Sequence, residues 1–576
     1  MDKAAPVKQL LIAPGGLYEV VEEDVRGNRM PVFRHRACSL PELLSRSARF
    51  GERTFLVDGH VRLDFATHLA MVDAFASNLQ RRFGVRSGDR VAIYAANRWE
   101  WVVCFWAIVS AGAIPAAFNS WWTPDEFAHA AELVEPVLVI GDGPRCERIV
   151  QSAVEVPILD LDELVEIVNE HAGERPDAPP AAEDDPAVLI FTSGTTGRPK
   201  AVTAPHRAAI GFAQVKTFAD AIGRVGAGGP VPVAGDQIPA SDDVALATAP
   251  LFHSSMLYGV VLMALVRGAA LVLLPGRFDP ERVLATIERE QVTSWLAMGS
   301  AGPRVSSSPA LGRYDNTSLR QIGFGGAPVS PAVQDALRRA FPSAAESLAL
   351  GYGSTEAGAV VASINGSEFR ANPTSTGRAE VTTRLELRDP AGLPVPQGAV
   401  GEVHVRSPYL MLGYWGNRAA SSEVLKDGGW LAMGDIAGMR DGLLFIDSRA
   451  RDLILVSAEN VAPTEVEYCL EGHRGVLEAA VFAVDDDVTG DAVCAAVTLS
   501  ADNAPATVEL VAWCRERLAH YKVPTRWYLR TEPLPRTASG KLVKHVLRSL
   551  VEDGALAEPA GSAPTATGAT SREDLP

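Results

Sequence analysis

The sequence predicts an α/β protein with a large amino-terminal domain and a second, smaller α+β domain. The chain has 576 residues and 47% hydrophobic content, which is too long for one ordinary domain. Apolar runs of strand length alternate with helical patterns up to about residue 380, as in proteins with largely parallel sheets. From residue 381 to 447 the runs are shorter and turns are frequent, which predicts a β-rich subdomain.

Buried parallel strands are predicted where short runs of Val, Ile, Leu and Phe are bounded by Gly, Pro or Asp. The runs of this kind are 90–96, 136–142, 186–192, 269–275 and 320–326. Helical patterns separate them, which is the order of repeated βαβ units.

Two apolar stretches require a choice between a membrane span and buried secondary structure. Residues 101–122 contain no charged side chain and have the length of a span. Gly, Pro and Asn interrupt the second half, so we predict a buried helix followed by a buried strand. Residues 258–276 contain Arg267 and Gly268 and are predicted as helix, turn and strand. We therefore expect no integral membrane span.

The domain boundaries follow from changes in pattern and composition. The predicted segments are a leader (1–35), a large domain (36–451), a small domain (452–550) and a tail (551–576). In the small domain, 476–486 and 492–500 are predicted strands and 507–521 is a predicted amphipathic helix. The tail is small, polar and poor in aromatic residues, so we expect it to be disordered.

Charge and cysteine content narrow the partners and the compartment. The chain has 53 Lys and Arg against 70 Asp and Glu, a net charge of -17, which does not favour nucleic acid. Its six cysteines are scattered without a Cys-x-x-Cys pair, which fits a reducing cytosol better than a zinc or disulfide framework. The first residues lack the long apolar run of a secretory signal. We predict a cytoplasmic protein without a nucleic-acid partner, and a homodimer stays open.

The stretch FTSGTTGRPKAV, residues 191–202, offers many hydrogen-bond donors. It follows a predicted strand and precedes a helical pattern, so its backbone N–H groups, hydroxyls and Lys200 suit a polyphosphate. The spacing is not that of a Walker A loop, because Gly194 and Gly197 enclose two residues and Pro199 precedes the lysine. Taken alone, such a loop is more often a polar surface turn.

Two further Gly-rich turns end apolar runs, IGFGGAP at 322–328 and LGYGSTEAG at 350–358. Loops at the carboxyl ends of strands bind ligands in α/β sheets, so we expect the three turns to serve one site. Tyr352 lies between two glycines, which leaves its ring accessible for stacking, and Glu356 offers a carboxylate suited to Mg²⁺. The alternative for Glu356 is a charge at a helix N-terminus.

Five more motifs follow these three turns in the chain. They are GEVHVRSPYLMLGYW, GGWLAMGDIA, SRARDLILVSAENVAPTEVE, HYKVP and PRTASGK. The eight motifs in this order resemble the AMP-forming acyl-CoA synthetases, in the adenylate-forming superfamily of acyl- and aryl-CoA ligases, luciferases and peptide-synthetase adenylation domains. The resemblance covers roughly residues 35–550. It implies layered αβαβα sheets in the large domain and a small domain that is mobile.

The resemblance assigns an ATP site to the three turns. The first turn is expected to close on the β- and γ-phosphates, while Thr355 holds the α-phosphate and Glu356 binds Mg²⁺. The phosphate-loop positions are Thr192, Ser193, Gly194, Thr195, Thr196, Gly197 and Lys200. The adenine-binding positions are Gly325, Gly326 and Ala327 on one ring face, and Tyr352 with Gly353 on the other.

Other matching positions are single residues. Asp435 is expected to bind both ribose hydroxyls and Arg449 to add a second ribose contact, although such a pair is more often a surface ion pair. Lys541 matches the mobile catalytic lysine, which stabilises charge between the carboxylate and the α-phosphate; its alternative is a solvent-facing lysine. His253 matches the residue at the acyl-pocket entrance, or is a histidine in a turn. Asp452 matches the hinge residue.

The implied reaction has two steps. A carboxylate attacks the α-phosphate of MgATP, which gives acyl-AMP and pyrophosphate; the small domain then turns about its hinge and CoA displaces AMP. Ser457, Ala458 and Glu459 are expected to line the CoA tunnel. Ala458 and Ser448 stand where the family usually has Gly, and Arg451 where Lys is common. Of these, Ala458 bears on the access of CoA.

The predicted function is ATP-dependent ligation of a fatty or other hydrophobic carboxylic acid to CoA, with Mg²⁺. Small side chains near SSMLYG, WLAMGSAGP and AGAVV predict a roomy apolar pocket for the acid. The alternatives are a stand-alone adenylating enzyme that loads a carrier protein, a nucleotide-binding protein that has lost catalysis, and a luciferase-like oxygenase. The sequence shows no Gly-Gly-x-Ser carrier site after the ligase motifs, and the intact site residues argue against lost catalysis.

Overall fold

The structure is a computed structural model in two compact units. It describes residues 5–170, 173–192, 198–327, 329–449, 452–456, 459–486, 490–500, 503–537 and 542–556. Unit 1 comprises 1–327, 336–433 and 438–445, and unit 2 comprises 328–335, 434–437 and 446–576. The predicted domain boundary between residues 451 and 452 stays a prediction.

A seven-stranded sheet in unit 1 has the strand order β20-β10-β9-β6-β5-β7-β8. Its strands are β5 (Arg90–Tyr94), β6 (Ile114–Ala117), β7 (Leu138–Gly141), β8 (Ile158–Asp160), β9 (Pro186–Thr192), β10 (Lys200–Pro205) and β20 (Gly413–Tyr414). The strands from β9 to β8 pair in parallel, whereas β10 and β20 are antiparallel. The structure confirms that the apolar runs at 90–96, 136–142 and 186–192 form buried strands, because β5, β7 and β9 are buried along most of their length.

A nine-stranded sheet in unit 1 has the order β17-β16-β15-β14-β13-β11-β12-β3-β4. Its strands are β3 (Thr54–Asp58), β4 (Val61–Asp64), β11 (Val244–Ala247), β12 (Ala270–Leu273), β13 (Ser294–Leu296), β14 (Gln321–Gly325), β15 (Leu348–Tyr352), β16 (Ala362–Asn365) and β17 (Arg378–Ala379). The run from β15 to β3 is parallel, and the strands at the edges are antiparallel.

Helices connect and cover these sheets. They include α2 (Leu40–Arg46), α3 (Phe65–Arg81), α4 (Trp99–Ser110), α8 (His206–Gly226), α9 (Ser254–Met256), the π-helical segment η3 (Leu257–Leu262) and α10 (Met263–Arg267). Further helices of unit 1 are α1 (Ala5–Leu11), α5 (Pro124–Val134), α6 (Gly143–Gln151), α7 (Leu164–Glu170), α11 (Pro280–Glu290), α12 (Ala301–Ser306), α14 (Gly366–Ala371) and α15 (Arg418–Val424). The unit boundary falls within α13 (Pro331–Ala340). α4 contacts β5 and β6 of one sheet and β3 of the other, so it lies between the two sheets. This layering confirms the predicted α/β class.

The two apolar stretches are buried secondary structure, as predicted. Residues 101–122 form most of α4 and then β6, and 258–276 form η3, α10 and then β12. The side chains of α4 from Trp99 to Val109 are all buried. None of the described helices is both long and apolar enough to cross a membrane.

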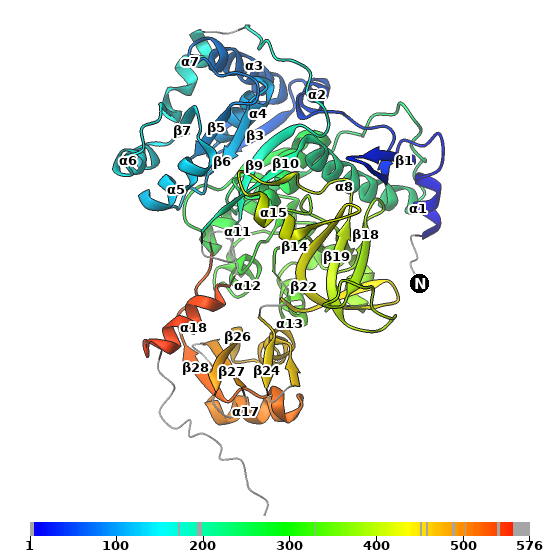
Figure 1. The fold of residues 1–576 in the computed structure, drawn as a ribbon, viewed down its shortest axis with the longest axis vertical. Coiled ribbons are helices and arrows are strands. Elements are labelled where there is room, and N and C mark those ends of the chain that lie inside the picture. The colour runs from blue at the N-terminus through cyan, green and yellow to red at the C-terminus, as the bar shows by residue number, and fades with distance from the viewer. Residues whose placement is uncertain are drawn as a thin grey trace, which may run out of the picture. The chain divides into compact units, whose positions relative to one another are not determined.

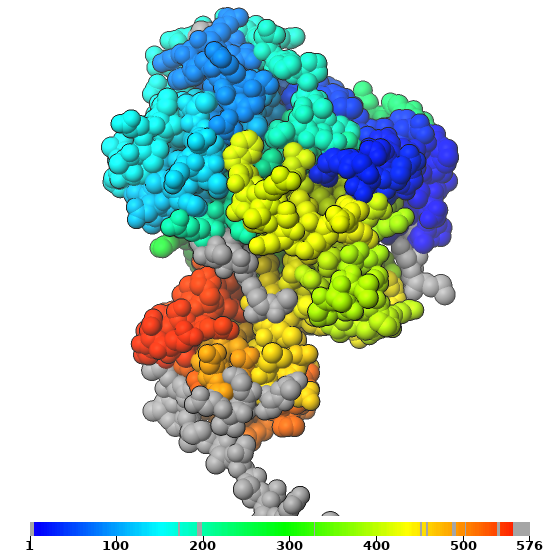
Figure 2. Space-filling model, viewed as in Figure 1, coloured from blue at the N-terminus to red at the C-terminus, as the bar shows by residue number. Residues whose placement is uncertain are grey.

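The predicted leader is instead part of unit 1. β1 (Val20–Val25) and β2 (Asn28–Phe33) form a hairpin around Arg26 and Gly27, both at positive φ. The Arg26 guanidinium donates hydrogen bonds to the carbonyls of Leu410 and Met411, both at 3.2 Å. Figure 2 shows the dark-blue surface of this segment against the yellow surface of residues near 410. The Arg-Gly turn between two apolar-containing runs is the signal that the sequence prediction missed.

The predicted β-rich subdomain is a third sheet with the order β18-β19-β22-β21, with β23 paired to β22. Its strands are β18 (Arg384–Arg388), β19 (Gly401–Arg406), β21 (Leu425–Lys426), β22 (Trp430–Arg440) and β23 (Leu443–Arg449). The division between the two units falls within β22 and β23.

Unit 2 is an α+β fold around one sheet with the order β25-β24-β27-β26, with β28 paired to β27. Its elements are β24 (Ile454–Val456), β25 (Glu459–Val461), β26 (Val476–Asp486), β27 (Gly490–Leu499), β28 (Arg526–Arg530), α16 (Pro463–Glu471), α17 (Thr507–Arg515) and α18 (Lys544–Glu552). Figure 1 shows β26, β27 and β28 side by side, with α18 next to β26. The predicted helix 507–521 ends earlier, at Arg515.

The predicted disordered tail begins too early. Residues 551 and 552 belong to α18, and Val551 and Leu556 pack against a buried cluster that includes Leu547 and Tyr528. These apolar side chains stabilise the end of the helix, so the chain is ordered past the predicted start of the tail. Residues 557–576 lie outside the described residues.

Candidate active site

The predicted phosphate-binding positions lie in a connection between antiparallel strands. Thr192 is the last residue of β9 and pairs with Lys200, the first residue of β10. Ser193, Gly194, Thr195, Thr196 and Gly197 lie outside the described residues. The helical pattern predicted after this stretch begins at His206, which is where α8 begins, whereas the strand β10 was not predicted. Figure 1 shows β9 and β10 side by side, next to α8.

The predicted adenine-binding positions meet at the carboxyl ends of two neighbouring strands in the nine-stranded sheet. β14 and β15 are parallel, and Gly325 pairs with Gly351, so the turns that follow the two strands begin side by side. The structure therefore brings together Gly325, Gly326, Ala327, Tyr352 and Gly353. A Cβ added to Gly325 would meet nothing nearer than Gly351 O at 3.7 Å. Packing therefore does not require a glycine at this position.

The turn after β15 depends on two glycines. A Cβ on Gly353 would lie 2.2 Å from the carbonyl oxygen of Ala359, and one on Gly358 would lie 2.6 Å from that of Tyr409. Gly358 also has φ +79, which side chains disfavour. Residues 353–361 form turns without a helix, so Glu356 is not a helix N-terminal charge. The carboxylate is instead presented from a tightly packed turn.

Glu356 is in contact with a residue that the sequence prediction did not name. The Tyr414 hydroxyl donates a hydrogen bond to Oε1 of Glu356 at 3.0 Å. The Nζ of Lys200 lies 4.9 Å from the centroid of the Tyr414 ring. Burial, followed by the Glu356 charge, raises the pKa of Tyr414, so its phenol stays protonated and remains a donor. Tyr414 thus connects the predicted metal-binding carboxylate to the predicted phosphate-binding lysine.

Thr355 and His253 lie near a second unpredicted partner. The Thr355 hydroxyl is 3.0 Å from that of Ser254, the first residue of α9. His253 precedes this helix, and its ring centroid is 4.5 Å from that of Phe252. The structure therefore places Thr355, the predicted α-phosphate contact, next to Ser254, which follows His253 at the predicted pocket entrance.

Asn97 fixes the loop that carries His253. Its Nδ2 donates to the carbonyl of Ala249 at 2.8 Å, and its Oδ1 accepts from the N–H of Leu251 at 2.9 Å. Asn97 follows β5 of the seven-stranded sheet, whereas the loop follows β11 of the nine-stranded sheet. Neither partner is close to Asn97 in the sequence, so no motif pointed to this contact.

The predicted ribose-binding residues both belong to unit 2. Asp435 on β22 and Arg449 on β23 form an ion pair with Nε and Oδ1 at 3.4 Å. Asp435 is buried and Arg449 is half exposed. Asp452, the predicted hinge residue, follows β23, and Glu459 begins β25 with an exposed side chain. Ser457, Ala458 and Lys541 lie outside the described residues.

Glu356 has the chemistry that a magnesium site requires. A carboxylate oxygen is a preferred Mg²⁺ ligand, and Mg²⁺ is usually held by one or two carboxylates together with substrate phosphates. Within the described part of the chain, no group of three or more His, Cys, Asp or Glu side chains is arranged to hold a metal ion. Mg²⁺ itself stays a prediction.

Comparison with known proteins places these features in a family. The family model described as AMP-binding enzyme matches residues 44–415, and the AMP-binding enzyme C-terminal domain matches 465–541. The chain belongs to the AMP-binding enzyme family. A feruloyl-CoA synthase from Amycolatopsis sp is 34% identical over 85% of this chain and 94% of its own length.

Two other similar proteins extend this comparison. A 7a-methyl-1,5-dioxo-octahydroindenyl-propanoyl:CoA ligase from Rhodococcus jostii is 32% identical over 88% of this chain and 98% of its own. The solved structure of an anthranilate CoA ligase in complex with anthranoyl-AMP covers 90% of this chain and 98% of its own, with 25% identity and a TM-score of 0.80.

Membership of the AMP-binding enzyme family confirms the resemblance stated from the motifs. It also confirms the predicted enzyme class, an AMP-forming acid–CoA ligase, and supports ATP and CoA as the substrates shared by the class. The residue roles, the cytoplasmic location and a homodimer stay predictions.

Proposed function

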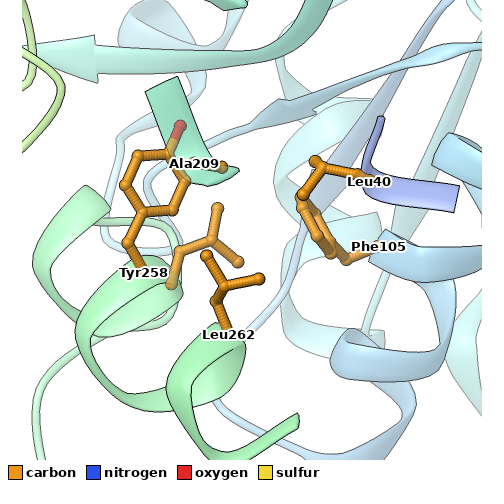
Figure 3. A pocket seen from close by; sticks show the side chains of 6 residues that line it. Leu40, Phe105, Ala209, Tyr258 and Leu262 are labelled. Atoms are coloured by element: carbon orange, nitrogen blue, oxygen red, sulfur yellow. The ribbon is translucent and has the colours of Figure 1, made fainter. Parts of the chain in front are cut away.

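We propose that this AMP-binding enzyme activates a hydrophobic acid that contains a ring with a polar substituent, and transfers it to CoA. The substrate proposal is supported by the ring acids named for the similar ligases. An apolar cavity of about 10 Å³ lies next to the segment after His253, which is smaller than the roomy pocket predicted from the sequence, so a ring would require it to widen. It is lined by Leu40, Phe105, Ala209, Leu257, Tyr258 and Leu262. Figure 3 shows Tyr258 and Leu262 on one side of this cavity and Leu40 and Phe105 on the other.

Tyr258 carries the one hydroxyl among the six side chains that line the cavity. Its ring is buried and its hydroxyl has no hydrogen-bond partner in the described part of the chain. Burial raises the pKa of Tyr258, so the phenol is neutral and able to donate. An unsatisfied buried hydroxyl is costly, and a substrate hydroxyl or carbonyl would relieve that cost. The ring acids named for the similar ligases carry such groups, which supports the proposal over a plain fatty acid.

The residue roles follow from the site geometry and from the family motifs. We propose that Lys200 binds the terminal phosphates of ATP, Thr355 the α-phosphate, and Glu356 a Mg²⁺ ion that neutralises phosphate charge. Ser254, hydrogen-bonded to Thr355, is placed to fix the threonine hydroxyl. Asp435 and Arg449 are proposed to bind the ribose, and Lys541 to stabilise charge as the acyl–phosphate bond forms.

A paired comparison of acids tests the substrate proposal. AMP release and acyl-CoA formation are measured with 4-coumarate, cinnamate and decanoate, with and without CoA. Wild type should prefer 4-coumarate to cinnamate by kcat/KM, because only the former carries a hydroxyl for Tyr258. Tyr258→Phe should reduce that preference about tenfold, as expected for one buried hydrogen bond. Leu262→Met is the matched control, since it changes the same cavity without a polar group and should keep the preference.

Three outcomes would contradict the proposal. Decanoate as the better substrate would restore the fatty-acid alternative. A preference for 4-coumarate that survives in Tyr258→Phe would remove the assigned role of this hydroxyl. Acyl-AMP without thioester, together with loading of a carrier protein, would favour the stand-alone adenylating enzyme.

A further inference from the structure

The structure assigns to Tyr414 a positioning role: its hydroxyl orients the Glu356 carboxylate for Mg²⁺ while its ring supports the ammonium group of Lys200. This inference rests on the proposed function of Glu356 and Lys200. It adds a residue that couples the two, from a segment far from both in the sequence.

The first observation is the hydrogen bond to the carboxylate. The Tyr414 hydroxyl donates to Oε1 of Glu356 at 3.0 Å, across 58 residues of sequence. No other side-chain hydrogen bond to the Glu356 carboxylate is present among the residues that the structure describes. A phenol on one oxygen restricts rotation of the carboxylate and leaves Oε2 for another partner. A carboxylate fixed in this way is pre-oriented as a metal ligand.

The second observation is the position of Lys200 against the ring of the same tyrosine. The ammonium nitrogen is 4.9 Å from the ring centroid, within the range of a cation–π contact. Lys200 begins β10, and Tyr414 lies on the neighbouring strand β20, where it pairs with Val202. The lysine and the tyrosine are therefore held in register by the sheet itself.

The third observation is that the backbone around Tyr414 is anchored to both sides. Met411 donates to the carbonyl of Glu356 at 2.9 Å, and Trp415 donates to that of Ala201 at 2.8 Å. The N–H of Tyr414 donates to the Ser421 hydroxyl at 2.8 Å. The segment thus joins the turn after β15, in one sheet, to the strand that carries the phosphate-binding lysine, in the other. Tyr414 is the side chain at which the two meet.

The test measures nucleotide binding and does not depend on turnover. Calorimetry of the full-length protein gives the dissociation constant of α,β-methylene-ATP with and without Mg²⁺. Wild type should bind the analogue more tightly with Mg²⁺. Tyr414→Phe keeps the ring and should reduce this Mg²⁺-dependent gain about tenfold, as for the loss of one hydrogen bond to a charged group. Its affinity without Mg²⁺ should be unchanged, because Lys200 keeps its ring contact.

Two further variants complete the design. Tyr414→Leu removes the ring as well and should also weaken binding without Mg²⁺, by several-fold. Tyr409→Phe is the matched control: it removes a buried tyrosine hydroxyl that accepts from Thr382 in the same segment, and should leave the Mg²⁺ effect intact. Thermal unfolding of each variant shows whether the fold is retained.

The outcomes separate this inference from the function on which it rests. If wild type binds the analogue with a Mg²⁺ effect and Tyr414→Phe shows the same effect, the role of Tyr414 is wrong and the proposed function stands. If Tyr409→Phe loses the effect equally, the loss is general and the positioning role is also wrong. If wild type does not bind the analogue, the proposed function and this inference both fail.

Discussion

One missing side chain decides how the segment before Tyr414 packs on α8. A Cβ on Gly211 would lie 2.1 Å from Cε1 of Tyr409, so the tyrosine ring occupies the space of a side chain. Tyr409 is buried and its carbonyl approaches Gly358 in the turn that carries Glu356. A glycine within a helix is unfavourable for the helix alone, and this contact explains why it is tolerated.

Two substitutions in α8 separate packing from helix propensity. Gly211→Ala should lower the free energy of unfolding by about 1–3 kcal/mol, because the methyl group displaces the Tyr409 ring. Gly223→Ala, in the same helix, meets no atom within 4 Å and should raise it by up to about 1 kcal/mol. Urea unfolding measures both. Equal effects of the two changes would show that Tyr409 does not need this space.

A buried histidine predicts how stability depends on pH. His68 on α3 is fully buried against Phe55, and burial lowers its pKa to about 3. The unfolded chain binds a proton near pH 6.5, so between these values only the unfolded state is protonated. The stability contributed by the neutral imidazole is therefore complete above about pH 6.5 and is lost as the pH falls towards 3.

His68→Leu should reduce this acid sensitivity. Between pH 7 and pH 5 the free energy of unfolding of the variant should fall by about 2 kcal/mol less than that of wild type. Urea unfolding at the two pH values measures the difference. His60→Gln, at an exposed histidine, should behave as wild type. An unchanged pH dependence in His68→Leu would mean that this imidazole is not held neutral.

At the scale of elements, the predicted site residues lie in connections that follow strands of two different sheets. Parallel strands place the turns after β14 and β15 together, and the antiparallel pair β9 and β10 flanks the connection that is predicted to bind phosphate. Loops of this kind are stabilised by hydrogen bonds from side chains, because few of their backbone groups pair within regular structure. Asn97 stabilises the loop after β11 in this way, since it forms hydrogen bonds with two backbone groups of that loop.

Asn97→Ala should loosen that loop. Two hydrogen bonds are lost and both backbone groups lose their partner, which costs about 1–3 kcal/mol of stability. The KM for the acid should rise several-fold, because the loop also carries His253, while the KM for ATP changes little. Steady-state kinetics measure both constants. Asn28→Ala, which removes an exposed hydrogen bond in the β1–β2 turn, should change neither. A rise in the KM for ATP alone would contradict the proposed place of His253.

At the scale of the whole molecule, the chain divides into a large and a small compact unit. The two predicted catalytic steps require different groups, first a lysine that stabilises charge between the carboxylate and the α-phosphate, and then the CoA thiol that attacks the acyl carbon. We propose that the small domain turns between the steps, as in the hinge motions that remake active sites. Lys541, in the small domain, is then expected to act in the first step only.

Lys541→Ala tests whether this lysine acts in the adenylation step only. Adenylation, followed by pyrophosphate exchange, should fall by about a hundredfold or more, as for loss of an oxyanion donor. Thioester formation from synthetic acyl-AMP and CoA should continue at a rate near that of wild type. Equal losses in the two half-reactions would rule out an alternation of the small domain.

The sequence by itself determined the family, the enzyme class and the central parallel strands. Motifs are contiguous, and runs of apolar residues report burial without knowledge of their neighbours, so β5, β9 and β14 were identified directly. The same holds for Glu356 and Tyr352, which lie within motifs.

Only the tertiary structure decided the partners of these residues. Tyr414, Ser254 and Asn97 are separated by 58, 101 and 152–154 residues from the groups they bind, and no local pattern encodes such distances. The strand β10 was missed for a related reason. A strand is stabilised by the neighbours it pairs with as well as by its own sequence, and β10 lies between β20 and β9, which only the fold places beside it.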